Sequence, residues 1–194
     1  QDETSHEDVK EARQLIIQVD GEYIKSSDKY QGNFEVLVSH VYNPENHIPG
    51  TYRESGSRKS GIIEDKIYSA SALKDRGKTI RKMTVSAAKK QGMTKNTNIT
   101  ALSDGAKNCW TIIKSLASEC NKIEYILDWY HIKHKCTTVR SKLEDPYASE
   151  LKSIQWKIWH GEKEDAISRL SKLYLGLIDS DSAAKLHDLL KYLS

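Results

Sequence analysis

Short apolar runs, bounded by polar residues and turn signals, dominate the first two thirds of the 194-residue chain. Runs of this kind, rich in β-branched and aromatic residues, predict β-strands. The first run, Leu15–Val19, predicts a buried strand that ends at Asp20. Further strands are predicted at residues 33–42, 62–72, 98–102 and 123–127.

Apolar residues at helical spacing lie between these runs. Residues 74–91 predict a helix that stops at Gly92, because glycine favours the position just after a helix. Trp110 and Ile113, with Leu116 one turn further on, predict a second, amphipathic helix.

The chain becomes helical again from Tyr130, and no strand pattern follows Pro146. The last fifty residues therefore predict a small all-helical appendage. Its three apolar stripes are Leu151, Ile154 and Ile158, then Ala166, Leu170, Leu173 and Leu177, then Leu186, Leu189, Leu190 and Leu193.

The predicted order of elements is β-β-β-α-β-α-β-α followed by helices. It predicts an α/β fold with a mixed five-stranded sheet, an antiparallel meander joined to parallel strands. Right-handed crossovers would make strands one, four and five parallel neighbours. We expect two parts, a core at residues 13–144 and a helical appendage at residues 145–194.

Three acids, Asp20, Asp104 and Asp128, follow the three strands expected to be parallel. Sites in open sheets form beyond the carboxyl ends of such strands. Neighbouring carboxylates repel each other unless a cation neutralises them, and Mg²⁺ binds one or two carboxylates together with substrate phosphate oxygens. Two such ions could assist attack on a phosphodiester. Asp20-Gly21 and Asp104-Gly105 are alternatively two ordinary turns.

A further pattern is "DWYHIKH", in which Asp128, His131 and His134 recur at every third position. At the start of a helix they would share a face and could contact a metal ion or a phosphate. Alternatively, Asp128 caps the helix and the histidines are ordinary polar groups.

The net charge is only +3, but residues 74–95 are rich in Lys and Arg, with Asp75 as their one acid. This segment could follow a phosphate backbone, or it could be a solvated helix face. The four tryptophans could stack on bases, although core packing is the favoured interpretation. Cys109 is interpreted as a small core residue.

The three cysteines show no paired spacing, which argues against a disulfide framework or a structural zinc site and favours a reducing, cytoplasmic location. No apolar run is long enough to span a bilayer, so we expect no membrane partner. The polar, acidic N-terminus is unlike a signal peptide.

Several of these segments also carry a family likeness, over roughly residues 13–178. They are "VDGEYIK", "LSDGAKNCW", "ILDWYHIKHK" and "WHGEKEDAISRL". In this order they resemble the catalytic domain of bacterial insertion-sequence transposases related to the Mutator-like group, which have an RNase H-like fold.

The resemblance implies a DDE-type enzyme that uses Mg²⁺ or Mn²⁺ to cut and rejoin DNA at transposon ends and target. Asp20 and Asp104 match the first two metal-binding catalytic acids. Asp128 and His131 match the family's accessory Asp-or-Cys, two residues, His motif. A homo-oligomer of the full-length protein is an open possibility.

The resemblance also implies a third acid, a Glu in a glycine-rich segment after the helical insertion. No such segment precedes Ser194, so we expect a fragment, either excised or from a truncated gene, that is inactive alone. Two alternatives stay open: a non-catalytic DNA-binding protein derived from a transposase, or a related RNase H-like nuclease. The nuclease would need another acid near Asp20, for which Glu22 and Asp128 are candidates.

Overall fold

The computed structural model describes residues 9–27, 32–51, 60–72, 74–177 and 182–194. The chain divides into two compact units, Gln1–Ile126 and Leu127–Ser194. This division differs from the expected boundary after residue 144, because the helix that follows the last strand packs with the C-terminal helices. Each unit is described separately below.

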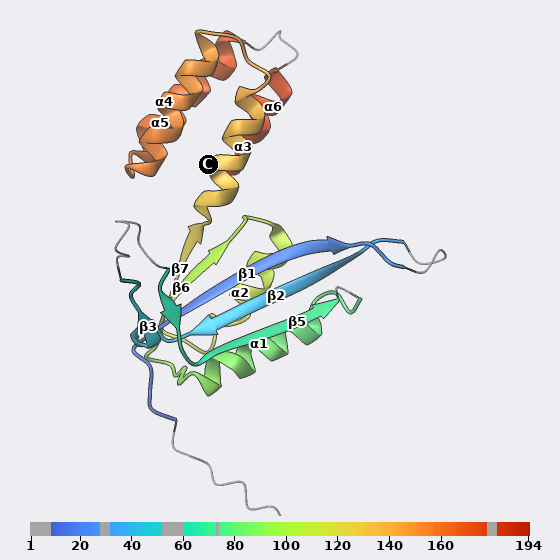
Figure 1. Ribbon diagram of the computed structural model, residues 1–194, viewed down its shortest axis with the longest axis vertical. Helices are drawn as coiled ribbons and strands as arrows, with labels where there is room; N and C mark the ends of the chain where they lie inside the picture. Colours follow the sequence, from blue (N-terminus) through green and yellow to red (C-terminus); the bar gives the residue numbers. More distant parts are fainter. Residues whose placement is uncertain (1–8, 28–31, 52–59, 73, 178–181) are drawn as a thin grey trace, which may run out of the picture. The chain divides into compact units, whose positions relative to one another are not determined.

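The first unit is built on a five-stranded mixed sheet in the order β5-β2-β1-β6-β7 (Figure 1). β1 pairs antiparallel with β2, β2 pairs antiparallel with β5, and β1 pairs parallel with β6. The meander, the order of the strands and the parallel pairing of β1 with β6 are therefore confirmed. The strands are β1 (Gln14–Ile24), β2 (Phe34–Tyr42), β5 (Lys66–Ala72), β6 (Asn98–Ser103) and β7 (Lys122–Leu127).

β1 is longer than the sequence predicts. It continues through Asp20 to Ile24, so the prediction that this strand ends at Asp20 is wrong. The extra residues stay extended because β2 pairs with them as far as Ile24↔Phe34. The parallel pairing with β6 does stop here, at Val19↔Ser103. Asp20 therefore marks the end of the parallel pair, and not the end of the strand.

Two helices, α1 (Lys78–Lys90) and α2 (Lys107–Lys114), cover one face of this sheet. Alternate strand residues such as Leu15, Ile17 and Val19 point into the core between sheet and helices, where they are fully buried. Burial of these apolar side chains is the main stabilising contribution in such a layer.

A buried hydrogen bond also joins α1 to the sheet. Ser39 Oγ and Thr84 Oγ1 lie 2.7 Å apart, and Thr84 Oγ1 donates to the carbonyl oxygen of Ile80 at 2.8 Å. Thr84 uses its single proton in that bond, so the Ser39 hydroxyl is the donor to Thr84. The pair satisfies two hydroxyls inside an apolar layer.

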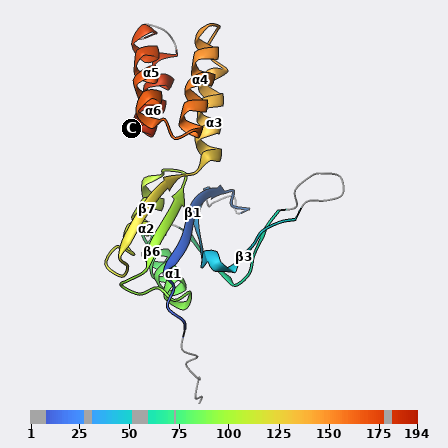
Figure 2. The same cartoon turned by 90° about the vertical axis from the view of Figure 1, so that its left-hand side faces the viewer.

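The segment between β2 and β5 forms a small two-stranded sheet, β3 (His47–Ile48) with β4 (Ile62–Ile63). It follows a 3₁₀ turn, η1 (Pro44–Asn46), and extends away from the five-stranded sheet (Figure 2). The strand predicted at 62–72 is therefore two strands, β4 and β5, separated at Asp65, which has a positive φ of 46°.

The second unit contains the helices α3 (Trp129–Arg140), α4 (Tyr147–Trp159), α5 (Lys163–Gly176) and α6 (Ala183–Leu193). Their inward faces form a second core around Leu151, Ile154 and Leu170. A two-point ion pair between Arg169 and Glu150, with N–O distances of 2.9 and 2.7 Å, joins α5 to α4. The three helices predicted after Pro146 are confirmed, and α3 completes the bundle.

The tryptophans differ in their surroundings. Trp110 packs against the core of the first unit and Trp129 against that of the second, as expected. The expectation of core packing is wrong for Trp156 and Trp159, each 53% exposed, because both lie near the end of α4. None of the described helices is long and apolar enough to cross a membrane.

The end of α1 is held by Gly92, as the sequence predicts. Gly92 has a φ of +86°, its N–H donates to the Lys89 carbonyl, and the Met93 N–H donates to the Ala88 carbonyl, which is a Schellman ending. Its own carbonyl accepts from Ala12 N–H at 2.9 Å, just before β1. A side chain would leave no space for this approach.

We therefore expect Gly92→Ala to lower the free energy of unfolding by about 2 kcal/mol. The new Cβ would overlap the Lys10 carbonyl oxygen and lie 2.9 Å from the Ala12 nitrogen, in a backbone conformation that alanine disfavours. Urea denaturation measures the change. Gly32→Ala is the control, because a Cβ there meets nothing within 4 Å among the described residues. Equal stabilities of the two variants would contradict the prediction.

Candidate active site

Asp20 and Asp104 meet where the parallel pairing of β1 and β6 ends. Val19 is opposite Ser103, so the next residues along the two parallel strands are the two acids. Neighbouring residues of a strand point to opposite faces, and Val19 and Ser103 both point into the helix-covered core. The alternation therefore places the Asp20 side chain on the face that α1 and α2 leave open, whereas Asp104 comes just after β6 and begins the turn into α2.

Local hydrogen bonds fix both carboxylates. Asp104 Oδ1 accepts the Ala106 N–H at 2.8 Å and the Ser103 hydroxyl at 3.2 Å, and Gly105 makes the turn with a φ of +91°. Asp20 Oδ1 accepts the Gly21 N–H at 2.8 Å. The Asp104-Gly105 pair is thus a sharp turn, whereas Asp20-Gly21 remains in the strand.

The pKa of the Cys109 thiol is affected by both acids. Burial raises its pKa to about 12, and the negative charges of Asp104 and, more weakly, Asp20 contribute in the same direction. Cys109 is fully buried on α2, as expected for a core residue. The Cys109 thiol therefore feels the charge of Asp104, which precedes α2, more strongly than that of Asp20.

A shallow cavity of about 340 Å³ opens beside Asp20 on the uncovered face. Gln18, Asp20 and Glu22 line it from β1, and His40 of β2 and Tyr68 of β5 line it from the other side. The rings of His40 and Tyr68 stack with their centroids 4.4 Å apart. The cavity thus combines two carboxylates of β1, those of Asp20 and Glu22, with a flat aromatic surface.

His40 is a site residue that the sequence analysis missed. Its Nε2 is buried without a hydrogen-bond partner among the described residues, and burial, followed by the charge of Lys66, lowers its pKa. The sequence does contain a sign of this position. Side chains alternate between the two faces of a strand, so in "NFEVLVSHVY" His40 lies on the same face as Val38, the residue opposite Asp20. Recognising this would have required the strand register, which the sequence alone does not give.

Glu35 is a second missed residue, on the other side of the β1–β2 ribbon. Its Oε1 accepts a hydrogen bond from the side-chain amide of Asn108, at the start of α2. A Cβ on Gly21 would lie 3.0 Å from Leu37 and 3.1 Å from Glu35 Oε1. Gly21 is therefore needed for close packing under the ribbon, and not for a turn.

Asp128 and His131 lie together in the helical unit. Asp128 caps α3, because its Oδ1 accepts the Tyr130 N–H at 2.9 Å, and its Oδ2 lies 4.0 Å from His131 Nε2. The His134 ring stacks on Tyr130, with centroids 6.3 Å apart. The structure thus brings Asp20 and Asp104 together in one unit and Asp128 and His131 together in the other.

The donors at Asp20 and Asp104 fit a divalent cation of the Mg²⁺ type. Magnesium needs only one or two protein carboxylates when water and substrate phosphate supply its other ligands. Within the described parts of the chain, no group of three or more His, Cys, Asp or Glu side chains could hold a metal ion. A site here would depend on two carboxylates and on oxygens from the substrate.

No protein-family model, curated protein or solved structure matches this chain. The interpretation of the acid pair therefore rests on its own residues and geometry.

The lowered pKa of His40 predicts a loss of stability in acid. An unfolded histidine binds its proton near pH 6.5, whereas folded His40 needs a lower pH. Below about pH 6.5 the unfolded chain thus binds more protons than the native protein, and the free energy of unfolding falls. Urea denaturation at pH 7.5 and 5.5 should show this fall, and His40→Gln should make it shallower.

The exposed His47 provides the control for this experiment. His47→Gln should keep the pH dependence of the unsubstituted protein. An unchanged pH dependence in His40→Gln would contradict the burial of the ring.

Proposed function

We propose that this chain is the catalytic part of a DDE-type DNA transposase with an RNase H-like fold. Asp20 and Asp104 would hold Mg²⁺ or Mn²⁺ for cleavage and strand transfer of DNA. The single observation that supports this most is the register of β1 and β6, because Asp20 and Asp104 are the residues that directly follow the last partners of this parallel pair.

The roles of the residues follow from their positions. When bound, a divalent ion would neutralise the charge on the reacting phosphodiester and lower the pKa of the attacking hydroxyl. Asp104 would be held in place by the Ser103 hydroxyl and the Ala106 amide. The stacked rings of His40 and Tyr68 offer a surface for a nucleotide beside the acids.

Basic side chains favour a second candidate function, DNA binding without catalysis. Arg76, Arg81 and Lys107 line a cavity on the other side of the β1–β2 ribbon. The two candidates separate cleanly, because Asp20→Asn and Asp104→Asn would remove a metal-dependent activity but would leave DNA binding intact if binding is the whole function.

We expect Mn²⁺ to raise the unfolding temperature of the first unit. At ten times the dissociation constant, ligand linkage adds about 1.4 kcal/mol, or about 4 °C. Asp20→Asn and Asp104→Asn should abolish this rise. In metal-free buffer both variants should unfold at or above the temperature of the unsubstituted protein, because the repulsion between the carboxylates is removed.

Glu45→Gln is the matched control, because Glu45 is an exposed acid in η1, at the opposite end of β1 from Asp20. This variant should keep the full response to Mn²⁺. A response that survives in Asp20→Asn, or that is equally absent in Glu45→Gln, would exclude the acid pair as the metal site.

A further inference from the structure

A second cavity, of about 590 Å³, lies against α1 and α2. It opens at the start of both helices, where Gly77 precedes α1 and Lys107 begins α2. Its polar lining consists of three cations, one acid and two neutral groups, while Leu37 and Ile112 form its apolar part. The polar residues are Arg76, Arg81, Lys107, Glu35, Asn108 and Thr111.

The three cations of this cavity have no acidic partner among the described residues, because neither arginine nor Lys107 forms an ion pair there. The two nearby acids have other contacts: Glu35 accepts from Asn108, and Asp75 Oδ2 accepts from the Thr79 N–H and hydroxyl at 2.7 and 2.6 Å. Three cations against one acid, Glu35, in the lining of a cavity raise the local potential and attract anions.

The backbone at Arg76 adds a second observation. Arg76 has a φ of +56° and Gly77 a φ of +75°, so two consecutive residues are left-handed. Such a conformation is unfavourable for arginine, and glycine adopts it without strain. Strain of this kind at a cavity is typical of residues kept for function, because glycine at position 76 would fold more easily.

The cavity is close to the acid pair along the chain. Lys107 follows Asp104 by three residues, so their Cα atoms are separated by at most about 11 Å. One strand of B-form DNA presents a phosphate about every 3.4 Å of its axis. A DNA backbone that reaches Asp104 would therefore present its next phosphates within reach of Lys107.

We propose that this cavity, lined by Arg76, Arg81 and Lys107, binds the phosphate backbone of the DNA strand that passes the acid pair. The inference deepens the proposed function and shares its substrate, but it concerns binding and needs no metal. Arginine suits this role, because its planar guanidinium donates two parallel hydrogen bonds to a phosphate. Such contacts would hold the strand in register without reading its sequence.

The test measures binding of a fluorescent 20-base-pair duplex by anisotropy in EDTA, across a series of NaCl concentrations. Arg81→Gln and Lys107→Gln should each weaken binding about 3- to 10-fold at 0.1 M NaCl. Each should also lower the slope of log K against log salt by about 0.9 for every phosphate that the variant no longer neutralises.

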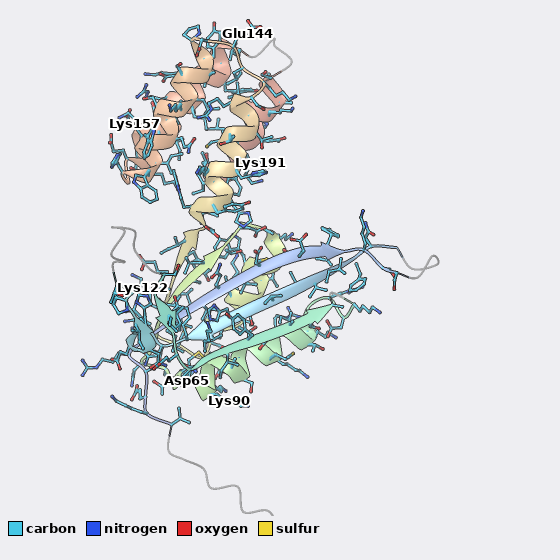
Figure 3. All side chains as sticks on the ribbon, in the orientation of Figure 1. Asp65, Lys90, Lys122, Glu144, Lys157 and Lys191 are labelled. Atoms are coloured by element: carbon cyan, nitrogen blue, oxygen red, sulfur yellow. The ribbon has the colours of Figure 1, made fainter. Side chains whose placement is uncertain are left out.

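Matched controls come from the far ends of the same helices. Lys90→Gln at the end of α1 and Lys114→Gln at the end of α2 remove the same charge from exposed positions. Lys90 is labelled in Figure 3. Both should keep the affinity of the unsubstituted protein within about 2-fold and leave the salt slope unchanged.

Arg76→Gly separates binding from folding. It removes a proposed phosphate contact but relieves the left-handed strain, so its unfolding temperature should be equal or higher while its affinity for DNA falls. If misfolding caused the weaker binding, both the unfolding temperature and the affinity for DNA would fall.

Several outcomes would overturn the inference. One is an equal decrease of DNA affinity in the cavity variants and in the control variants. Another is an unchanged salt slope in Arg81→Gln. A third is that inorganic phosphate binds to the cavity while the substitutions leave the affinity for the duplex unchanged. Because the assay contains no metal, failure of the Mn²⁺ response would reject the acid pair and leave this result standing. Weaker DNA binding in the cavity variants with an intact Mn²⁺ response would support both.

Discussion

The parallel pairing of β1 with β6, and the place where it stops, is the constraint on which the candidate site depends. Val19 and Ser103 are the last partners, and both face the buried layer. The next residue on each side is an acid: Asp20 stays in β1 and turns to the open face, whereas Asp104 begins the turn into α2. A shift of one residue in this register would move Asp104 out of line with Asp20 and would turn the apolar residues of one strand away from the buried layer.

The continuation of β1 divides the chemistry of the first unit between two sides of one ribbon. On the open side lie Asp20 and the stacked pair of His40 and Tyr68. On the helix side lie Glu35 and the basic cavity. Gly21 leaves room on the helix side, since any side chain there would press on Glu35 and Leu37.

Much of this arrangement could be predicted from the sequence, because apolar periodicity reports which face of a strand or helix is buried. The strand order and the stop of α1 at Gly92 are consistent with it. The length of β1 could not be predicted, since "DGEYI" is polar and stays extended only through its pairing with β2. His40 and Glu35 were missed for a related reason: their roles depend on cross-strand register. The grouping of α3 with the later helices depends on packing that no local pattern encodes.

Asp20 also affects the edge of the sheet. Once β6 has ended, β1 runs on with β2 as its one paired neighbour among the described strands, so its other side is an open row of backbone groups. The first amide past this point, that of Gly21, is bonded to the carboxylate of Asp20 itself. Asp20 thereby occupies the first backbone donor of an edge that could otherwise pair with a strand of another molecule. Glu22 and Lys25 add charge further along this edge. Replacing Asp20 by a small apolar residue would thus affect solubility as well as chemistry, whereas asparagine preserves the acceptor.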